Sequence, residues 1–192
     1  MVTSDARKDT RVAVFLDRDG VINQRAPEGD YITDPSDFEL LSGVASALKA
    51  LSDAGAALFV ATNQRGVARG LLTAEALEQI HAKMTADLQR AGVRLDGIYT
   101  CPHEEGECDC RKPGVGLMLQ ARADNPWIDF GRSHMVGDSM RDIEAGDRLG
   151  MHTWAVGPDH ADLVGRAAAS GIQVAGSAAS LAELVESRQL QP

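Results

Sequence analysis

Long hydrophobic segments are missing from this sequence of 192 residues. Its longest apolar runs, Val12–Leu16 and Ala54–Ala61, have the length of single strands, whereas a membrane-spanning helix needs about 20 apolar residues. The first residues, Met1–Arg11, are polar and of mixed charge, so they lack the apolar core of a secretory signal. We therefore expect a cytoplasmic protein with no membrane partner.

Clusters of basic residues are missing as well. Lysine and arginine number 19 against 28 acidic residues, which gives a formal net charge of −9 and a pI of about 5.0. An acidic surface repels a phosphate backbone, so we expect no nucleic-acid partner. Cysteine is also scarce: Cys101, Cys108 and Cys110 are the only three, and they fall within ten residues of one another. This pattern excludes a disulfide scaffold and favours metal binding.

The sequence does contain enough apolar material for a core, because 44% of its residues are hydrophobic. We expect one domain over residues 1–192, and a monomer. Apolar, strand-like runs alternate with helical patterns, which predicts a three-layer α/β fold with a Rossmann-like parallel sheet covered on both faces. The expected strands are Val12–Leu16, Ala57–Ala61, Gly97–Thr100, His134–Val136 and Thr153–Val156. The expected helices are Gly43–Ala54, a segment from Thr73 to about Gly92, Val115–Ala123, Ser139–Leu149 and two alanine-rich segments within Ala161–Leu190.

Two carboxylates follow the first expected strand directly. Asp17 and Asp19 are two residues apart, so an extended backbone sends both side chains the same way. Such a pair suits a divalent cation, and one carboxylate can act as a nucleophile while the other transfers protons. Gly20 allows a sharp turn beside a ligand. The alternative is a solvated acidic turn.

Further candidates follow other expected strands. Asp138 can complete an all-oxygen Mg²⁺ site, with Asp142 supporting it from one helical turn further along, although helix capping would also explain residues of this type there. Thr62 and Asn63 offer hydrogen-bond donors to a phosphate. Lys112 can bind a phosphate as a point charge and Arg111 can bind a second anion, although both residue types are more often solvated surface charges.

A separate cluster consists of Cys101, His103, Cys108 and Cys110. Three thiolates and one imidazole supply the four ligands of a tetrahedral structural Zn²⁺ site, and the short loop between His103 and Cys108 can close it. We therefore expect a zinc-binding loop over residues 101–110, with free reduced thiols as the alternative. Because this loop leads directly into Arg111 and Lys112, zinc would also position those two cations.

In their order along the chain, these motifs resemble those of the haloacid dehalogenase (HAD) superfamily of phosphatases. The resemblance rests on Asp17-Arg18-Asp19-Gly20, Thr62-Asn63-Gln64, Lys112, and Gly137-Asp138-Ser139 with Asp142. The Cys-Pro-His and Cys-Asp-Cys-Arg-Lys-Pro segments are similar to a zinc-containing branch without a cap domain, which includes phosphatases of heptose bisphosphate and of histidinol phosphate. Residues Thr62–Gly70 look more like the heptose group. The sequence departs from that pattern at Arg65, where a serine is usual, at Ser139, where a lysine is usual, and in its shorter zinc loop.

The resemblance implies a capless HAD-like sheet with strand order 5-4-1-2-3 and a phosphatase acting on a small phosphorylated sugar. It implies that Asp17 is the nucleophile, that Asp19 is the acid and base, and that Mg²⁺ is held by Asp17, the main-chain carbonyl of Asp19 and Asp138. It further implies substrate or phosphate contacts by Asp30, Tyr31, Thr62, Asn63, Gln64, Arg65, Arg111 and Lys112. The alternatives are histidinol phosphate as substrate, a phosphate-binding relative without catalysis, or a 3′-phosphatase of nucleic acid, which the negative charge disfavours.

Overall fold

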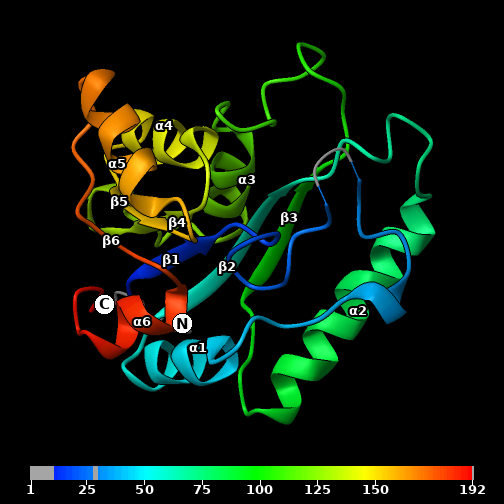
Figure 1. Ribbon diagram of the computed structural model, residues 1–192, viewed down its shortest axis with the longest axis horizontal. Helices are drawn as coiled ribbons and strands as arrows, with labels where there is room; N and C mark the ends of the chain where they lie inside the picture. Colours follow the sequence, from blue (N-terminus) through cyan, green and yellow to red (C-terminus); the bar gives the residue numbers. More distant parts are fainter. Residues whose placement is uncertain (1–10, 28–29, 192) are drawn as a thin grey trace, which may run out of the picture.

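The protein is described by a computed structural model that covers residues 11–27 and 30–191. Its centre is a parallel sheet of six strands in the order β3-β2-β1-β4-β5-β6 (Figure 1). The strands are β1 (Ala13–Leu16), β2 (Ala57–Asn63), β3 (Gly97–Cys101), β4 (His134–Gly137), β5 (His152–Val156) and β6 (Gly176–Ala178). The α-helices are α1 (Val44–Asp53), α2 (Ala74–Arg90), α3 (Gly116–Asp124), α4 (Met140–Arg148), α5 (His160–Ala169) and α6 (Leu181–Glu186), with 3-10 turns at Pro35–Asp37 and Phe130–Arg132.

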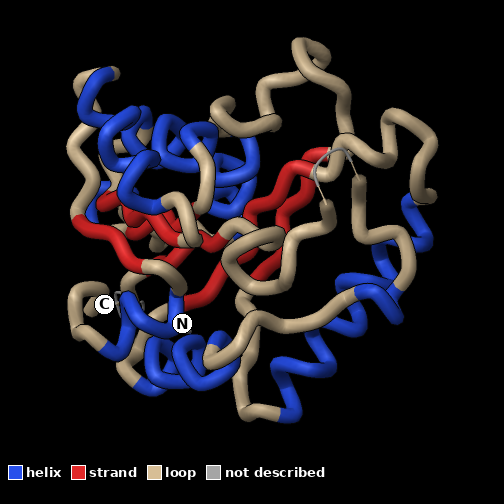
Figure 2. Tube along the Cα trace, in the orientation of Figure 1, coloured by secondary structure: helices blue, strands red, loops and turns tan. Residues whose placement is uncertain are grey.

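The core has two sides because successive side chains of a strand point to opposite faces of the sheet. Val14 and Leu16 of β1 pack into an apolar cluster with α1, α2 and α6, whereas Phe15 packs into a second cluster that includes residues of α3. All four residues of β1 are buried. Helices therefore cover both faces of the sheet, as Figure 2 shows with the strands between them. This is the three-layer α/β fold that the sequence predicts.

The five predicted strands and the predicted order 5-4-1-2-3 are confirmed, with ends that differ by one or two residues. The sixth strand was not predicted. Residues 161–190 read as helical segments alone, but β6 lies between α5 and α6 and pairs with β5, Trp154 with Gly176 and Val156 with Ala178. Its three residues, Gly-Ser-Ala, carry no β-branched or aromatic side chain that would mark a strand.

The long connection between β1 and α1 contains only loops, isolated bridges and one 3-10 turn within residues 17–27 and 30–43, so no cap domain is inserted in this described part. The strands are parallel, and their carboxyl ends meet at one edge, where ligands bind in open α/β sheets. None of the helices in the described ranges has the length and hydrophobicity needed to cross a bilayer. The expectation for the polar start of the chain concerns residues 1–10, which lie outside the described residues.

Candidate active site and metal centres

Three carboxylates far apart in the sequence meet at the carboxyl ends of β1 and β4. Oxygen atoms of Asp17, Asp138 and Asp142 all lie within 4.8 Å of one another. Gly20 makes this approach possible: its φ of 85° is in the left-handed region, and a Cβ atom there would overlap the carboxylate of Asp138. The convergence expected for Asp17 and Asp138 is therefore present.

The carboxylate cluster carries more negative charge than its protein partners neutralise. Burial raises the pKa of Asp17 to about 6, against the lowering effect of Lys112. Burial, followed by the charges of Asp17 and Asp142, raises the pKa of Asp138 to about 8. Carboxylate oxygens are the ligands that Mg²⁺ prefers, and a nearby cation would favour the ionised form of both groups. The donor set and its charge thus fit a hard divalent cation.

Lys112 is buried beside the cluster. Its Nζ atom lies 2.9 Å from Oδ1 of Asp17 and 2.5 Å from Oδ1 of Asp142. Burial alone would lower the pKa of Lys112, but the charges of Asp142 and Asp17 outweigh it and raise the pKa above its ordinary value. The other oxygen of Asp142 accepts hydrogen bonds from the backbone N–H and the hydroxyl of Ser139. Asp142 therefore both caps α4 and holds Lys112.

Asp19 is oriented differently from Asp17. Its carboxylate accepts hydrogen bonds from Arg18 on both oxygens, from Nδ2 of Asn23 at 3.0 Å and from Nε2 of Gln64 at 2.8 Å. Burial would raise the pKa of Asp19, but the charge of Arg18 and these hydrogen bonds outweigh it, so the pKa lies below its ordinary value. The side chain of Asp19 is absent from the group of three clustered carboxylates. Its predicted metal contact uses the main-chain carbonyl, and that contact remains a prediction.

Arg18 was not singled out by the sequence, since a charged residue in a polar turn usually faces solvent. Its side chain is instead 1% exposed, and its Nη1 atom lies 3.3 Å from Nε2 of His81 on α2. Burial, reinforced by the charge of Arg18, lowers the pKa of His81 to about 4, so the ring is neutral near pH 7. Arg18 is therefore fixed between Asp19 and a neutral histidine.

The polar residues at the end of β2 and directly after it bond to other residues of the site. Asn63 bonds the backbone of Lys112 in both directions: its Nδ2 atom donates to the carbonyl and its Oδ1 atom accepts from the N–H, each at 3.0 Å. Gln64 donates from Nε2 to both Asp19 and the hydroxyl of Thr62. In this arrangement, Asn63 positions Lys112 and Gln64 positions Asp19. Their predicted contacts with a phosphate remain predictions.

Arg111 contributes a guanidinium group to the site. Its Nη1 atom is buried and has no hydrogen-bond partner within residues 11–27 and 30–191. Arg111 and Lys112 line a cleft of about 330 Å³ together with Asp17 and Asp19. The same cleft is lined by the remaining predicted contacts, Asp30, Tyr31, Asn63, Gln64 and Arg65, and additionally by Arg25, Arg69 and Arg141. Thr62 is buried at the end of β2.

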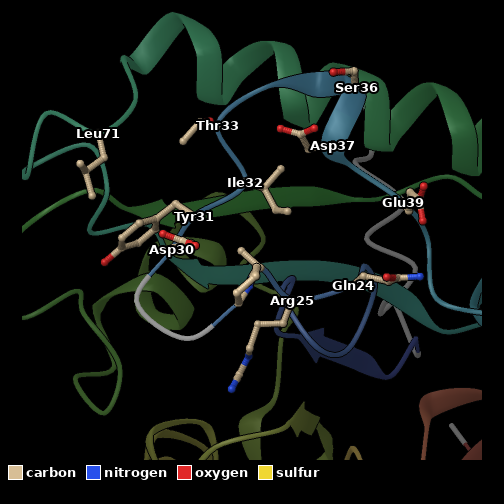
Figure 3. Close-up of a pocket in the computed structure, with 12 residues that line it drawn as sticks. Gln24, Arg25, Asp30, Tyr31, Ile32, Thr33, Ser36, Asp37, Glu39 and Leu71 are labelled. Carbon is tan, nitrogen blue, oxygen red and sulfur yellow. The ribbon is translucent and has the colours of Figure 1, made fainter.

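A wider hollow of about 640 Å³ adjoins this cleft and shares Arg25, Asp30 and Tyr31 with it. Figure 3 shows Tyr31 and Leu71 toward one end of the hollow, while the side chain of Arg25 extends out of it. The Nη2 atom of Arg25 reaches Oδ1 of Asp138 at 2.5 Å. This ion pair joins the loop after β1 to the carboxylate cluster. No spacing or periodicity in the sequence signals it.

The predicted zinc ligands Cys101, His103, Cys108 and Cys110 converge in the loop after β3. Their ligand atoms all lie within 4.8 Å of one another, with four of the pairs 3.1–3.7 Å apart, and the three cysteines are free thiols. Burial would raise the pKa of Cys108, but hydrogen bonds, first among them that of Cys110, lower it to about 7. Three sulfur donors and one imidazole nitrogen at these separations fit a tetrahedral Zn²⁺ site.

Comparison with known protein families matches residues 11–161 to the family described as polynucleotide kinase 3 phosphatase. The chain belongs to this phosphatase family. The chain is similar to the D-glycero-β-D-manno-heptose-1,7-bisphosphate 7-phosphatases of Haemophilus ducreyi and Escherichia coli K12. The first is 43% identical over 149 residues, which cover 73% of this chain and 80% of the relative. The second is 43% identical over 141 residues, which cover 69% of this chain and 72% of the relative.

Solved structures agree with this family membership. A D,D-heptose 1,7-bisphosphate phosphatase from B. bronchiseptica, determined with magnesium and phosphate, superimposes with a TM-score of 0.81 at 31% identity, covering 92% of this chain and 97% of that one. A HAD-like phosphatase from Mesorhizobium loti superimposes with a TM-score of 0.75 at 28% identity, covering 93% and 86%. The expected HAD-like phosphatase fold is thereby confirmed.

Proposed function

We propose that this protein is a Mg²⁺-dependent phosphatase that removes the 7-phosphate of D-glycero-D-manno-heptose 1,7-bisphosphate through an aspartyl-phosphate intermediate. The observation that carries the proposal is the meeting of Asp17 and Asp138 beside the buried ammonium group of Lys112. This arrangement supplies a nucleophile, a cation site and a fixed positive charge at one sheet edge. The heptose substrate is suggested by the relatives that bear its name.

Asp17, Asp138 and the main-chain carbonyl of Asp19 would hold the magnesium ion. When bound, Mg²⁺ neutralises charge on the transferring phosphoryl group. Cys101, His103, Cys108 and Cys110 would hold the structural zinc ion. In this proposal, Lys112 and Thr62 stabilise the phosphoryl oxygens by charge and hydrogen bonding.

The reaction follows from the roles of the two motif carboxylates. An oxygen of Asp17 attacks phosphorus as the bond from phosphorus to the sugar oxygen breaks, and the sugar oxygen takes a proton from the protonated form of Asp19, which the second step regenerates. Asp19 then removes a proton from water, which attacks phosphorus and releases inorganic phosphate and free Asp17. The hydrogen bonds of Arg18, Asn23 and Gln64 stabilise ionised Asp19, the form that accepts a proton from water.

Substrate selection falls to side chains at the mouth of the cleft. Arg111, whose Nη1 atom has no hydrogen-bond partner in the described part of the chain, suits the anionic end of the substrate that does not react. Asp30, Tyr31 and Arg65 line the cleft from the loops after β1 and β2 and would contact the sugar, with Asn63 and Gln64 behind them. We further propose that the protein acts as a cytoplasmic monomer, folded as one domain over residues 1–192, without nucleic-acid or membrane partners.

Phosphate release from a substrate panel tests the proposal. The panel contains both anomers of the heptose bisphosphate, histidinol phosphate and a 3′-phosphorylated oligonucleotide, each with and without Mg²⁺. We expect the highest kcat/KM for a heptose bisphosphate, and only with Mg²⁺. Asp17→Asn should bind this substrate but release almost no phosphate, while the matched control Asp53→Asn, on the exposed end of α1, should equal the wild type. Near-normal turnover by Asp17→Asn would contradict the nucleophile assignment.

A further inference from the structure

Three loops meet at the mouth of the cleft, and backbone hydrogen bonds join two of them. The N–H of Gln64 donates to the carbonyl of Cys101 at 2.7 Å, and the N–H of Ala68 donates to the carbonyl of Pro102 at 3.1 Å. The loop after β2 thus lies directly along the segment that carries the zinc ligands. A displacement of that segment would be transmitted to the loop after β2.

Glu104 adds a side-chain link between these two loops. It directly follows the zinc ligand His103, and its two carboxylate oxygens reach different arginines: Oε1 accepts from Nη1 of Arg65 and Oε2 from Nε of Arg69, each at 3.2 Å. The N–H of Glu105 donates to Oε1 at 3.0 Å, which fixes the orientation of the carboxylate. Glu104 therefore bridges the metal-binding loop to two cations that line the cleft.

Arg65 continues the link to the third loop. Its Nε atom lies 3.3 Å from the hydroxyl of Tyr31, in the loop after β1. The next residue, Gly66, has no side chain, and a Cβ atom there would lie only 3.0 Å from the ring of Tyr31. The ring consequently packs close to the backbone beside Arg65. Tyr31 and Arg65 line the cleft, and Glu104 supports Arg65 from beside it, so the three residues form one chain of contacts.

We propose that Glu104 is a positioning residue, which holds Arg65 and through it Tyr31 in place, so that the zinc loop sets the affinity for the part of the substrate beyond the reacting phosphate. This inference rests on the proposed function, since it assumes that the cleft binds a phosphate monoester. Glu104 makes none of the described contacts with Asp17, Asp138 or Lys112. Its loss should therefore change substrate binding and leave the chemical step intact.

Glu105 provides a matched control. It has the same charge, neighbours Glu104 and also faces Arg65, but its carboxylate is 4.0 Å from Nη1 of Arg65 and its side chain is 71% exposed. An exposed ion pair at this distance contributes little. A general effect of removing negative charge from this loop would appear in Glu105→Gln as well as in Glu104→Gln. An effect of position would appear in Glu104→Gln alone.

The test compares Glu104→Gln, Glu105→Gln, Arg65→Gln and the double variant Glu104→Gln/Arg65→Gln on two substrates with bound metals. One is heptose 1,7-bisphosphate and the other is p-nitrophenyl phosphate, which lacks a second anionic end. For Glu104→Gln we expect KM for the bisphosphate to rise about threefold to fivefold, with kcat and the KM for p-nitrophenyl phosphate unchanged. The double variant should be no worse than Arg65→Gln, because the proposed effect of Glu104 on the bisphosphate passes through Arg65.

Two measurements separate this inference from a folding defect and from the proposed function. Metal analysis should find the same zinc content in Glu104→Gln as in the wild type, and hydrogen exchange of residues 65–70 should be faster in Glu104→Gln but not in Glu105→Gln. The positioning role of Glu104 would be overturned by any of three results. These are an unchanged KM and unchanged hydrogen exchange in Glu104→Gln, additive effects on KM in the double variant, and loss of zinc from Glu104→Gln. A wild type that hydrolyses p-nitrophenyl phosphate but not the bisphosphate would instead contradict the proposed substrate, while the exchange measurement still decides the role of Glu104.

Discussion

The ammonium group of Lys112 donates to the carboxylate of Asp17 across 2.9 Å, although β2 and β3 lie between the two residues in the sequence. The contact places a buried positive charge beside the carboxylate that the proposed mechanism uses as its nucleophile. Lys112 keeps this position because Asp142 holds its Nζ atom and Asn63 holds its backbone. The reactive carboxylate and its counter-charge are thus positioned independently of any ligand.

Removal of this counter-charge should impair the chemical step severely. We expect Lys112→Met to lower kcat by about 100-fold or more, the size of effect seen when a fixed transition-state charge stabiliser is lost. It should also lower the free energy of unfolding by about 3–5 kcal/mol, because Asp142 loses its buried partner. Steady-state kinetics and urea unfolding measure both effects. The control Lys49→Met, at an exposed side chain of α1, should change neither kcat nor the free energy of unfolding. A Lys112→Met variant with normal activity would contradict the proposed role of Lys112.

Magnesium affinity should depend on pH. In the metal-free protein, burial raises the pKa of Asp17 to about 6 and, with neighbouring charges, that of Asp138 to about 8. Only ionised carboxylates bind the cation, so affinity should increase from pH 6 to 8 and level off above that range. Titration calorimetry in two buffers of different ionisation enthalpy should detect proton release on binding. An affinity independent of pH across this range would show that these carboxylates are not the ligands.

The same pKa shifts predict the pH dependence of stability without metal. In the folded protein Asp17 and Asp138 keep their protons above pH 4, where unfolded aspartates ionise. The folded state therefore binds more protons than the unfolded state between about pH 4 and 8, and these two groups should lower the stability as pH rises through that window. Unfolding of the metal-free protein in urea at several pH values measures the trend. Asp138→Asn should flatten its upper part.

Gly20 should be required for metal binding and not only for backbone conformation. Gly20→Ala would place a methyl group on the carboxylate of Asp138, so we expect loss of Mg²⁺ binding and of activity. Gly55→Ala is the matched control, because Gly55 also has a positive φ, 94°, but no atom of the described residues lies within 4 Å of the Cβ position. Both variants should lose roughly 1 kcal/mol of stability from left-handed backbone strain. Calorimetric Mg²⁺ binding equal in the two variants would contradict this account of Gly20.

The cysteine and histidine cluster should contain about one zinc ion per chain. Cys110→Ser removes one of the four ligand atoms, so this variant should lose the ion. It should also unfold at a lower temperature, because the remaining side chains are then no longer joined by a metal ion. Asp109→Asn, between two of the ligands, should retain the metal. Elemental analysis and thermal unfolding provide the measurements. A folded, active protein without zinc would leave reduced thiols as the correct interpretation.

Sequence patterns predicted the strands β1–β5, their order and the residues at their carboxyl ends, because buried parallel strands are marked by apolar runs that stop at polar residues. They did not predict β6, whose small side chains carry no such mark. They also did not show that Arg18 folds inward onto Asp19, that Arg25 reaches Asp138, or that Asn63 bonds the backbone of Lys112. These contacts depend on side-chain orientation and on the three-dimensional approach of loops, which periodicity and spacing do not encode.

The paired hydrogen bonds between Asn63 and the backbone of Lys112 fasten the far end of the metal-binding loop to the neighbouring strand β2. The near end is fastened there too, since Cys101 pairs with Asn63 of β2, and its carbonyl accepts from the N–H of Gln64, the residue that follows the strand. With both ends of the loop held beside β2, the turn between His103 and Cys108 can lengthen or shorten without shifting Lys112, the cation that we propose takes part in the reaction. The length of the metal-binding loop can therefore differ between related proteins while the position of Lys112 beside Asp17 stays the same.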